Sequence, residues 1–490
     1  MLKVIAILAA LAGALLFPTT ALSAFNIMHS FAGPEGETPA APLVQGTDRL
    51  LYGVAAHGGD FTVLGPDGGG TVFRTDSSGN VTTLHAFDGV DGAVPTGIVG
   101  GSDGALYGTT AYGGQLGISA LNPGTGVIYR MDAAGQLTVL FVFPGGERGY
   151  RPGPLMQGLD GALYGTAVGG SSLYARFPGI VYRFDPATRD YRILHTFVIN
   201  DGRGPTGKLF QAPDGFFYGT TNQGGPWNSG VVYKVNAAGD FAIVHAFNTN
   251  EGSEPKGGVF QASDGFFYGT LEFGGYGGRI FRMDAGGNLK VLFSFGPYSS
   301  AGWRPVANPI EARDGFLYGT TPRGGTSSSG SDGVVYRLSR SGSLWVLHSF
   351  SGPDGIAPSA PLFQASDGRL YGSTVVGGAR GLGTLFRLPT SDPALLPTLE
   401  SLYVDPPSVV GGWSATGTLT LSWAAPPGGA VISLSTDSTL TTLPATVTLP
   451  AGAQKVSFAI GTRATRKWRV ATMTASYNGS QTSATLTITR

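Results

Sequence analysis

Short runs in which apolar and polar residues alternate follow one another along most of the chain. Around Tyr218 four such runs stand in order, KLFQA (208–212), FFYGTT (216–221), GVVYKVN (230–236) and FAIVHAF (241–247). They are separated by Asp-Gly, a Gly-rich loop and an AAG turn, which are typical connections between antiparallel strands. The pattern predicts four strands, named A to D here, joined by an A–B turn, a B–C loop and a C–D turn.

The same phrase recurs along the sequence as DRLLYG, DGALYG twice, DGFFYG twice, DGFLYG and DGRLYG. Its tyrosine stands at Tyr52, Tyr107, Tyr164, Tyr218, Tyr268, Tyr318 and Tyr371, in steps of 55, 57, 54, 50, 50 and 53 residues. A sustained period near fifty made of short strands is typical of β-propeller blades rather than of helical solenoids. Asp-Gly in six of the seven A–B turns suits a tight hairpin that needs a positive φ.

The order of the strands indicates how the ring closes. Strand D ends at Phe31, Phe87, Phe143, Phe197, Phe247, Phe295 and Phe350, so the first strand D, at 25–31, precedes any strand A. The last strand C, at 385–388, has no strand D after it. We therefore expect the N-terminal strand to complete the last blade, which removes exposed sheet edges. The prediction is an all-β fold with a seven-bladed propeller over residues 25–390, strand A innermost and strand D outermost.

A second domain is expected near the C-terminus. Three prolines, Pro389, Pro393 and Pro397, mark a Pro-rich linker at 391–398. Residues 399–490 then alternate apolar and polar positions in seven short runs, which is typical of a small antiparallel sandwich. This module resembles the Ig-like modules of bacterial secreted proteins, without the cysteine pair of antibody domains, and we expect it to act as a spacer or a weak adhesion module.

The first 24 residues have the features of a secretory signal peptide. They hold one lysine, an apolar run at 4–17 and small residues at 21–24. A membrane anchor is the competing interpretation, but a span needs about 20 apolar residues. We expect a secreted or periplasmic protein that is not inserted in a membrane after cleavage.

Composition narrows the chemistry. Lysine plus arginine equals aspartate plus glutamate, at 31 each, so no overall field attracts nucleic acid. The absence of cysteine excludes disulfides and thiolate chemistry.

A family resemblance rests on the repeat itself. The LYGTT..GG stretch, followed by VVYR and then LHxF, resembles the GloVer tandem repeat of exported choice-of-anchor proteins over about residues 25–390. The resemblance implies an exported protein, and it does not supply a biochemical role.

Candidate binding residues come from the variable loops. From the phrase tyrosine to the basic residue that ends strand C the separation varies between 14 and 23 residues, so the B–C loop holds nearly all of the length variation. Variable loops on a fixed frame are where binding usually resides. With the D–A connections of the same face they give these candidates for a glycan or peptide site: His57, Tyr112, Arg151, Tyr174, Arg176, Asn222, Trp227, Glu272, Tyr276, Trp303 and Arg304.

The leading hypothesis is a non-catalytic binding or surface-interaction protein, with no catalytic residue, metal or cofactor assigned. Five of the six histidines share one strand D position, where inter-blade packing explains them better than a metal cluster, since they are spread round the outer rim. One alternative is an enzyme of the streptogramin-lyase type, in which His57 and Glu147, Glu251 or Glu272 would act near the axis with a divalent ion. A second alternative is a purely structural extracellular protein.

Overall fold

The structure, a computed structural model, is built from β-strands. It describes residues 25–490 except 61–66, 116–122, 169–177, 328–331, 391–396, 423–424, 426–428 and 451–452. Within this part the helical structure is one 3-10 turn, η1 (Gly146–Arg148). The all-β prediction is confirmed. No helix of the described residues is long and apolar enough to cross a lipid bilayer.

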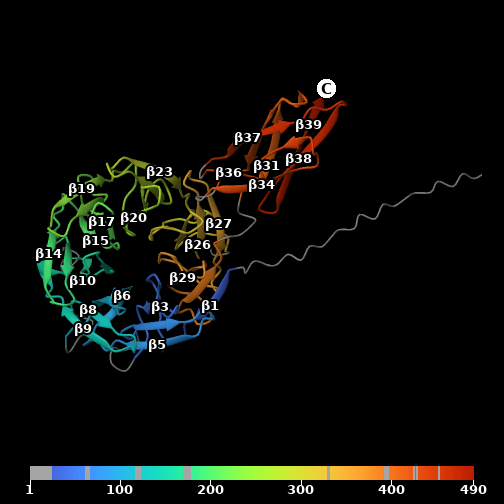
Figure 1. The fold of residues 1–490 in the computed structure, drawn as a ribbon. Coiled ribbons are helices and arrows are strands. Elements are labelled where there is room, and N and C mark those ends of the chain that lie inside the picture. Colours follow the sequence, from blue (N-terminus) through green and yellow to red (C-terminus); the bar gives the residue numbers. More distant parts are fainter. Residues whose placement is uncertain are drawn as a thin grey trace, which may run out of the picture.

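Residues 26–388 form seven antiparallel sheets that Figure 1 shows arranged as a ring. Each runs in the order A, B, C, D, and in sheets 3 and 4 strand A is split in two. The first three sheets are β2 (Val44–Gln45), β3 (Leu51–Ala55), β4 (Thr71–Thr75) and β5 (Val81–Ala86); β6 (Ala93–Gly100), β7 (Leu106–Tyr112), β8 (Val127–Met131) and β9 (Leu137–Val142); and β10 (Tyr150–Pro152), β11 (Met156–Gln157), β12 (Leu163–Val168), β13 (Ile180–Phe184) and β14 (Tyr191–Thr196).

Sheets 4 to 7 repeat this order. They are β15 (Arg203–Pro205), β16 (Phe210–Gln211), β17 (Phe217–Gln223), β18 (Val231–Val235) and β19 (Phe241–Ala246); β20 (Val259–Gln261), β21 (Phe267–Leu271), β22 (Arg279–Met283) and β23 (Leu289–Ser294); β24 (Ile310–Glu311), β25 (Leu317–Thr321), β26 (Val334–Leu338) and β27 (Leu344–Ser349); and β28 (Phe363–Gln364), β29 (Leu370–Thr374), β30 (Thr384–Leu388) and β1 (Asn26–Ser30).

The two ends of the ring meet in sheet 7. Strand β1 pairs antiparallel with β30, with Asn26 opposite Arg387 and Ser30 opposite Thr384. The expected closure by the N-terminal strand is thus observed. The hydrophobic core lies between neighbouring sheets in separate clusters, one of which joins sheet 7 to sheet 1 through residues such as Tyr371 and Phe73.

The aspartate of the repeated motif accepts the same two hydrogen bonds in every A–B turn. In the turn of sheet 4 the two oxygens of Asp214 accept hydrogen bonds from the Phe216 N–H at 3.0 Å and the Tyr218 hydroxyl at 2.8 Å. The other six aspartates make the same pair of bonds. The aspartate therefore links the A–B turn to the tyrosine of strand B in the same motif. The turn type alone did not reveal this role.

An amide at the end of strand A links neighbouring turns. Gln157 Oε1 accepts from the Ser102 N–H of the preceding sheet at 2.8 Å, and Gln45 Oε1 accepts from the Ser366 N–H at 2.9 Å, across the closure. Among the described residues Gln261 Oε1 accepts no such bond from sheet 4, where the facing residue is Pro213 and has no N–H to donate.

A glycine and a proline form the joint between each sheet and the next. Gly230, just before strand C, has φ +92°, and a Cβ there would lie 2.8 Å from Cδ of Pro255 in the next sheet. Its carbonyl accepts from the Phe247 N–H at the end of strand D, at 3.1 Å. All seven sheets have this joint, at Gly70–Pro95, Gly126–Pro152, Gly179–Pro205, Gly230–Pro255, Gly278–Pro305, Gly333–Pro358 and Gly383–Pro39.

The repeated histidines each bind a carboxylate six residues later. The pairs are His29–Glu35, His85–Asp91, His195–Asp201, His245–Glu251 and His348–Asp354, at 2.6–3.2 Å. The rings also pack between sheets, since His195 stacks on Phe241 of the next sheet at 3.6 Å. These contacts agree with a packing role and add an acid partner that the repeat position had not indicated.

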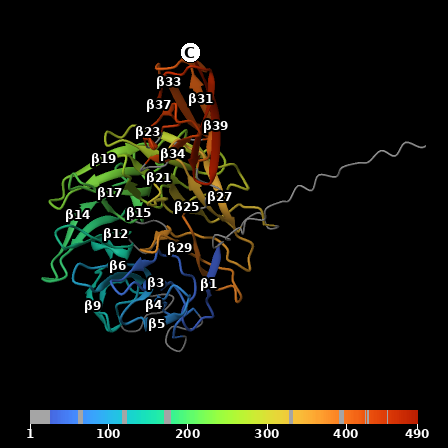
Figure 2. The same ribbon diagram turned by 45° about the vertical axis from the view of Figure 1, so that its right-hand side comes forward.

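Residues 399–489 form two further sheets around a core of their own (Figure 2). One contains β31 (Leu399–Asp405), β33 (Ala415–Leu421), β37 (Lys455–Thr462) and β35 (Thr441–Thr442). The other contains β32 (Ser408–Val410), β39 (Ser480–Thr489), β38 (Arg469–Tyr477), β34 (Ala430–Thr436) and β36 (Thr446–Leu449). Their shared core includes Leu419, Ile432, Met473 and Leu486, all fully buried.

Two glycine substitutions compare the stability contribution of a joint glycine with that of a glycine in an ordinary turn. Gly161→Ala, at φ +79° with open space around its Cβ, should cost about 1–2 kcal/mol of unfolding free energy from the backbone conformation alone. Gly230→Ala should cost roughly 3–5 kcal/mol, because the methyl group also overlaps Pro255 and the Thr221 carbonyl. Urea denaturation of the two variants measures the difference, and equal losses would mean that the joint tolerates a side chain.

The histidine pairs predict a loss of stability in acid. Burial lowers the pKa values of His195 and His348, although Asp201 and Asp354 oppose the shift. As the pH falls through the unfolded-state pKa of about 6.5, these histidines therefore bind protons more readily in the unfolded chain than in the folded one. The free energy of unfolding falls with the pH as a result. His195→Phe copies Phe141 and Phe293, which hold this position in two sheets, and should reduce the decline between pH 7 and 5 in denaturation titrations. A decline identical to that of the unmodified chain would contradict this origin.

Candidate functional site

The residue before each joint proline holds a strained backbone conformation. These residues lie on the face of the ring that carries the B–C loops and the D–A connections. Glu254 and Arg304 both have φ +57°, although a residue before proline normally avoids this region. Each donates its N–H to the B–C loop of the preceding sheet, Glu254 to the Ser229 carbonyl at 3.2 Å and Arg304 to the Gly277 carbonyl at 2.6 Å. The seven residues of this kind, named the X-Pro rim, are Thr38, Val94, Arg151, Gly204, Glu254, Arg304 and Ala357.

The rim carries the same backbone and different side chains. All seven φ angles lie between +50° and +65°. Strain that the surroundings hold in place often occurs at functional sites. The rim therefore presents a variable set of side chains at fixed points beside the variable B–C loops.

A group of four charged side chains lies where sheets 5 and 6 meet. Glu272 follows strand β21, and its side chain is 10 % exposed. Its carboxylate contacts the Lys256 ammonium and, at 3.4 Å, Nε of Arg304. Lys256 also contacts Glu254 at 3.1 Å. Burial disfavours the charged ammonium of Lys256, but the hydrogen bonds from both carboxylates outweigh this and raise its pKa.

Aromatic rings lie against one of these charged groups, the Arg304 guanidinium. The Arg304 guanidinium lies 4.4 Å from the ring centre of Phe273 and 5.6 Å from that of Trp303. Tyr298 packs on Trp303 with ring centres 4.9 Å apart. Phe273, Tyr276 and Tyr298 are 38 %, 87 % and 75 % exposed. Such a surface offers flat apolar faces beside fixed ionic groups, which suits a ligand with both kinds of surface.

Of the expected site residues, the structure brings two groups together. Glu272, Trp303 and Arg304 belong to the sheet 5–6 group described above. Tyr112 and Arg151 meet where sheets 2 and 3 adjoin, with the guanidinium 4.8 Å from the ring centre.

The other candidates lie apart. Asn222 accepts a hydrogen bond from the Thr206 hydroxyl at 3.0 Å, and Trp227 is 64 % exposed. His57 pairs through its backbone with Glu37, and its buried Nδ1 has no hydrogen-bond partner among the described residues. Tyr174 and Arg176 lie outside the described residues.

Two of the four residues named for an enzymatic site already bind other side chains. Glu251 binds His245, and Glu272 binds Lys256 and Arg304. Glu147 lies in η1, between sheets 2 and 3, whereas His57 follows strand β3 of sheet 1. Among the described residues no group of three or more His, Cys, Asp or Glu side chains could hold a metal ion.

The sequence indicated Trp303 as a binding residue but did not indicate several of its neighbours. Trp303 is half-buried and packs against the core between sheets 5 and 6. It therefore lies between this core and the exposed ring of Tyr298, which packs on it. The residues passed over are Glu254, Lys256, Tyr298 and Arg323. The proline at 255 and at 305, at one repeat position, was the signal that could have revealed Glu254 and its equivalents.

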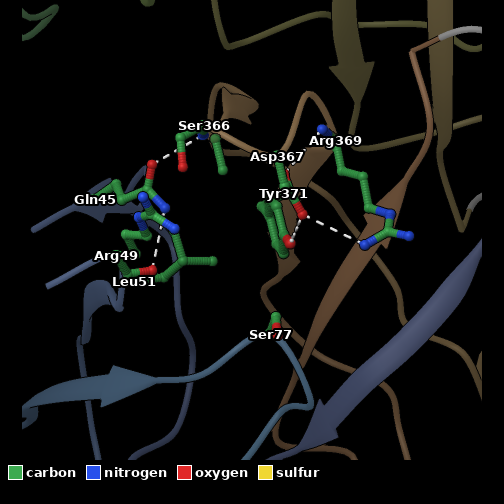
Figure 3. Close-up of a pocket in the computed structure, with 9 residues that line it drawn as sticks. Gln45, Arg49, Leu51, Ser77, Ser366, Asp367, Arg369 and Tyr371 are labelled. Carbon is green, nitrogen blue, oxygen red and sulfur yellow. Dashed lines mark hydrogen bonds and ion pairs between the residues drawn. The ribbon is translucent and has the colours of Figure 1, made fainter.

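A cavity of about 490 Å³ opens on the opposite face, at the seam between sheets 7 and 1 (Figure 3). Arg49, φ +66°, replaces the glycine of the other A–B turns there, and Arg369 stands across the cavity. In Figure 3 the Arg369 side chain extends away from Arg49, and it contacts Asp367 at 3.4 Å. The two arginines therefore do not converge on one point.

The repeat identifies the family. The chain matches the Gloeobacter/Verrucomicrobia repeat over residues 11–125, 117–331 and 276–416, and it belongs to this repeat family. A search of curated proteins finds no match.

Solved structures with propeller-like folds resemble the chain at low identity. A gluconolactonase from Xanthomonas campestris is 14 % identical, with 75 % of this chain and 95 % of that one covered and a TM-score of 0.37. PorZ, a surface component of the type-IX secretion system of Porphyromonas gingivalis, is 14 % identical, with 94 % and 61 % covered and a TM-score of 0.44. A xyloglucanase from Xanthomonas campestris is 14 % identical, with 82 % and 60 % covered and a TM-score of 0.44. These scores carry no information on what this chain binds.

Proposed function

We propose that the chain is an exported, non-catalytic binding protein that recognises a glycan through the X-Pro rim and its loops. In this proposal residues 1–24 are a signal peptide, 25–390 a seven-bladed β-propeller, 391–398 a linker and 399–490 an Ig-like module. Membership of the repeat family and the ring of sheets support the architecture. The composition of residues 1–24 supports export.

The observation that carries the proposal is the sheet 5–6 group. The carboxylates of Glu254 and Glu272 balance the charges of Lys256 and Arg304, so these side chains are held in place before a ligand arrives. Arg304 lies against the ring of Phe273, and Phe273 is still partly exposed. A pre-ordered set of hydrogen-bonding groups beside aromatic faces reduces the entropy lost on binding. Sugars present an apolar ring face and hydroxyls together, and they fit this set better than a purely charged or purely apolar ligand does.

Exposed tyrosines provide the test. Glycan-array binding of the purified chain should weaken about tenfold, near 1.4 kcal/mol, in Tyr276→Ala and in Tyr298→Ala, because each removes an exposed ring from one of the two loops that carry Glu272 and Arg304. Tyr403→Ala is the matched control, since Tyr403 is 62 % exposed on strand β31, outside the ring.

Unchanged binding in both tyrosine variants, or an equal loss in Tyr403→Ala, would place recognition elsewhere. Binding to peptides but to no glycan would support the proposed binding surface and would show that its ligand is a peptide.

A further inference from the structure

One end of the C-terminal sandwich collects basic and aromatic side chains. Strands β32 and β39 end there, at Val410 and Thr489, and strand β38 begins there at Arg469. Figures 1 and 2 show the C-terminal end of the chain at the end of the sandwich that points away from the ring. This surface, named the basic tip, consists of Trp413, Arg463, Arg466, Lys467, Trp468, Arg469 and Arg490.

Strand pairing and two loops bring these residues together. Arg469 is paired with Ile488, and Val410 with Thr489, so the three strand ends are adjacent. The Thr462 hydroxyl donates to the Trp413 carbonyl, which holds the loop after β32 beside the loop after β37.

The second loop is itself ordered. The Thr465 hydroxyl donates to the Lys467 carbonyl at 2.7 Å and accepts from the Lys467 N–H at 3.3 Å. Residues 466–468 are therefore held in a fixed turn, with all three side chains exposed.

The tip is positively charged and its charges are not neutralised locally. Residues 399–490 contain six basic and three acidic residues, and no aspartate or glutamate follows Asp437. No ion pair joins any tip cation to another described residue. Since the whole chain is balanced at 31 residues of each sign, this is a local concentration of charge.

Two exposed tryptophans accompany the charges. Trp413 is 71 % exposed and Trp468 is 69 % exposed. Tryptophans are usually much more buried than this in a folded domain. Trp468 lines a shallow cavity of about 480 Å³ together with Arg466, Lys467, Arg469, Val470 and Arg490.

We propose that the basic tip binds an anionic polysaccharide. An acidic sugar carries an apolar ring face and a carboxylate or sulfate within one residue, which matches an indole beside a guanidinium. The cavity has the volume of a small-ligand site, so one or two sugar residues fit it. This site is separate from the X-Pro rim and would give the chain a second, charge-dependent attachment.

The test measures binding of the full chain to immobilised polygalacturonate, with neutral dextran and a single-stranded oligonucleotide as comparisons. Arg466→Ser/Arg469→Ser should weaken binding to polygalacturonate at least tenfold, and Trp468→Ala severalfold. Raising NaCl from about 50 to 300 mM should weaken binding by the unmodified chain, because salt screens exposed charges. Arg192→Ser is the matched control, since Arg192 is an exposed arginine on strand β14 of the ring.

Each result decides the proposal. Loss in the tip variants with retained binding in Arg192→Ser supports it, and so does a weaker loss in Trp413→Ala, which leaves the cavity lining intact. Undiminished binding in the double arginine variant overturns it, as does equal binding to dextran. Equal affinity for the oligonucleotide would show a general polyanion surface and would also overturn it. Arg466, Trp468 and Trp413 are exposed loop residues, and thermal unfolding of each variant verifies that the sandwich is intact.

Discussion

The ring depends on a glycine that leaves room for the proline of the next sheet. At Gly230 one residue joins three segments: its carbonyl accepts from Phe247 at the end of strand D, its left-handed backbone opens strand C, and its missing Cβ leaves space for Pro255. A Cβ at this position would overlap Pro255, and a Cβ at each of the other six joint glycines would overlap the corresponding proline. Because the joint recurs in all seven sheets, the spacing of the sheets is set by backbone contact, and the hydrophobic clusters between them fill the space that this contact defines.

The same joint determines where chemical variety is possible. Proline fixes one side of the rim residue and the preceding B–C loop binds its N–H, so the backbone position is set whatever the side chain. Evolution of the sequence can then place Thr38, Val94 or Arg304 at equivalent points without moving a strand. The charged group at sheets 5 and 6 is one product of this freedom. The C-terminal basic tip uses a different device, in which strand ends of a sandwich collect cations on short loops.

The repeat made the strands and their order predictable because alternation, Asp-Gly turns and period are local properties of the sequence. The closure by residues 26–30 followed from counting strands. Side-chain partnerships between repeats were not predictable in this way. The repeated histidines indicated packing. Their acid partners were harder to recognise, because the residue six positions later is glutamate in some sheets, as at Glu35, and aspartate in others, as at Asp91. Likewise Glu272 meets Arg304 only because sheets 5 and 6 adjoin, and a linear pattern does not give the angle between them.

Closure by β1 also sets the order of events when the chain folds. The strand at 26–30 is synthesised before any other part of the ring, and its partner at 384–388 is synthesised after the segments that form the other six sheets. The first strand made is therefore the last one placed. Contacts so distant in sequence are slow to form, because loop closure must precede the contact energy that rewards it. Until then residues 26–30 stay available to other chains, and the open edge of β30 stays exposed.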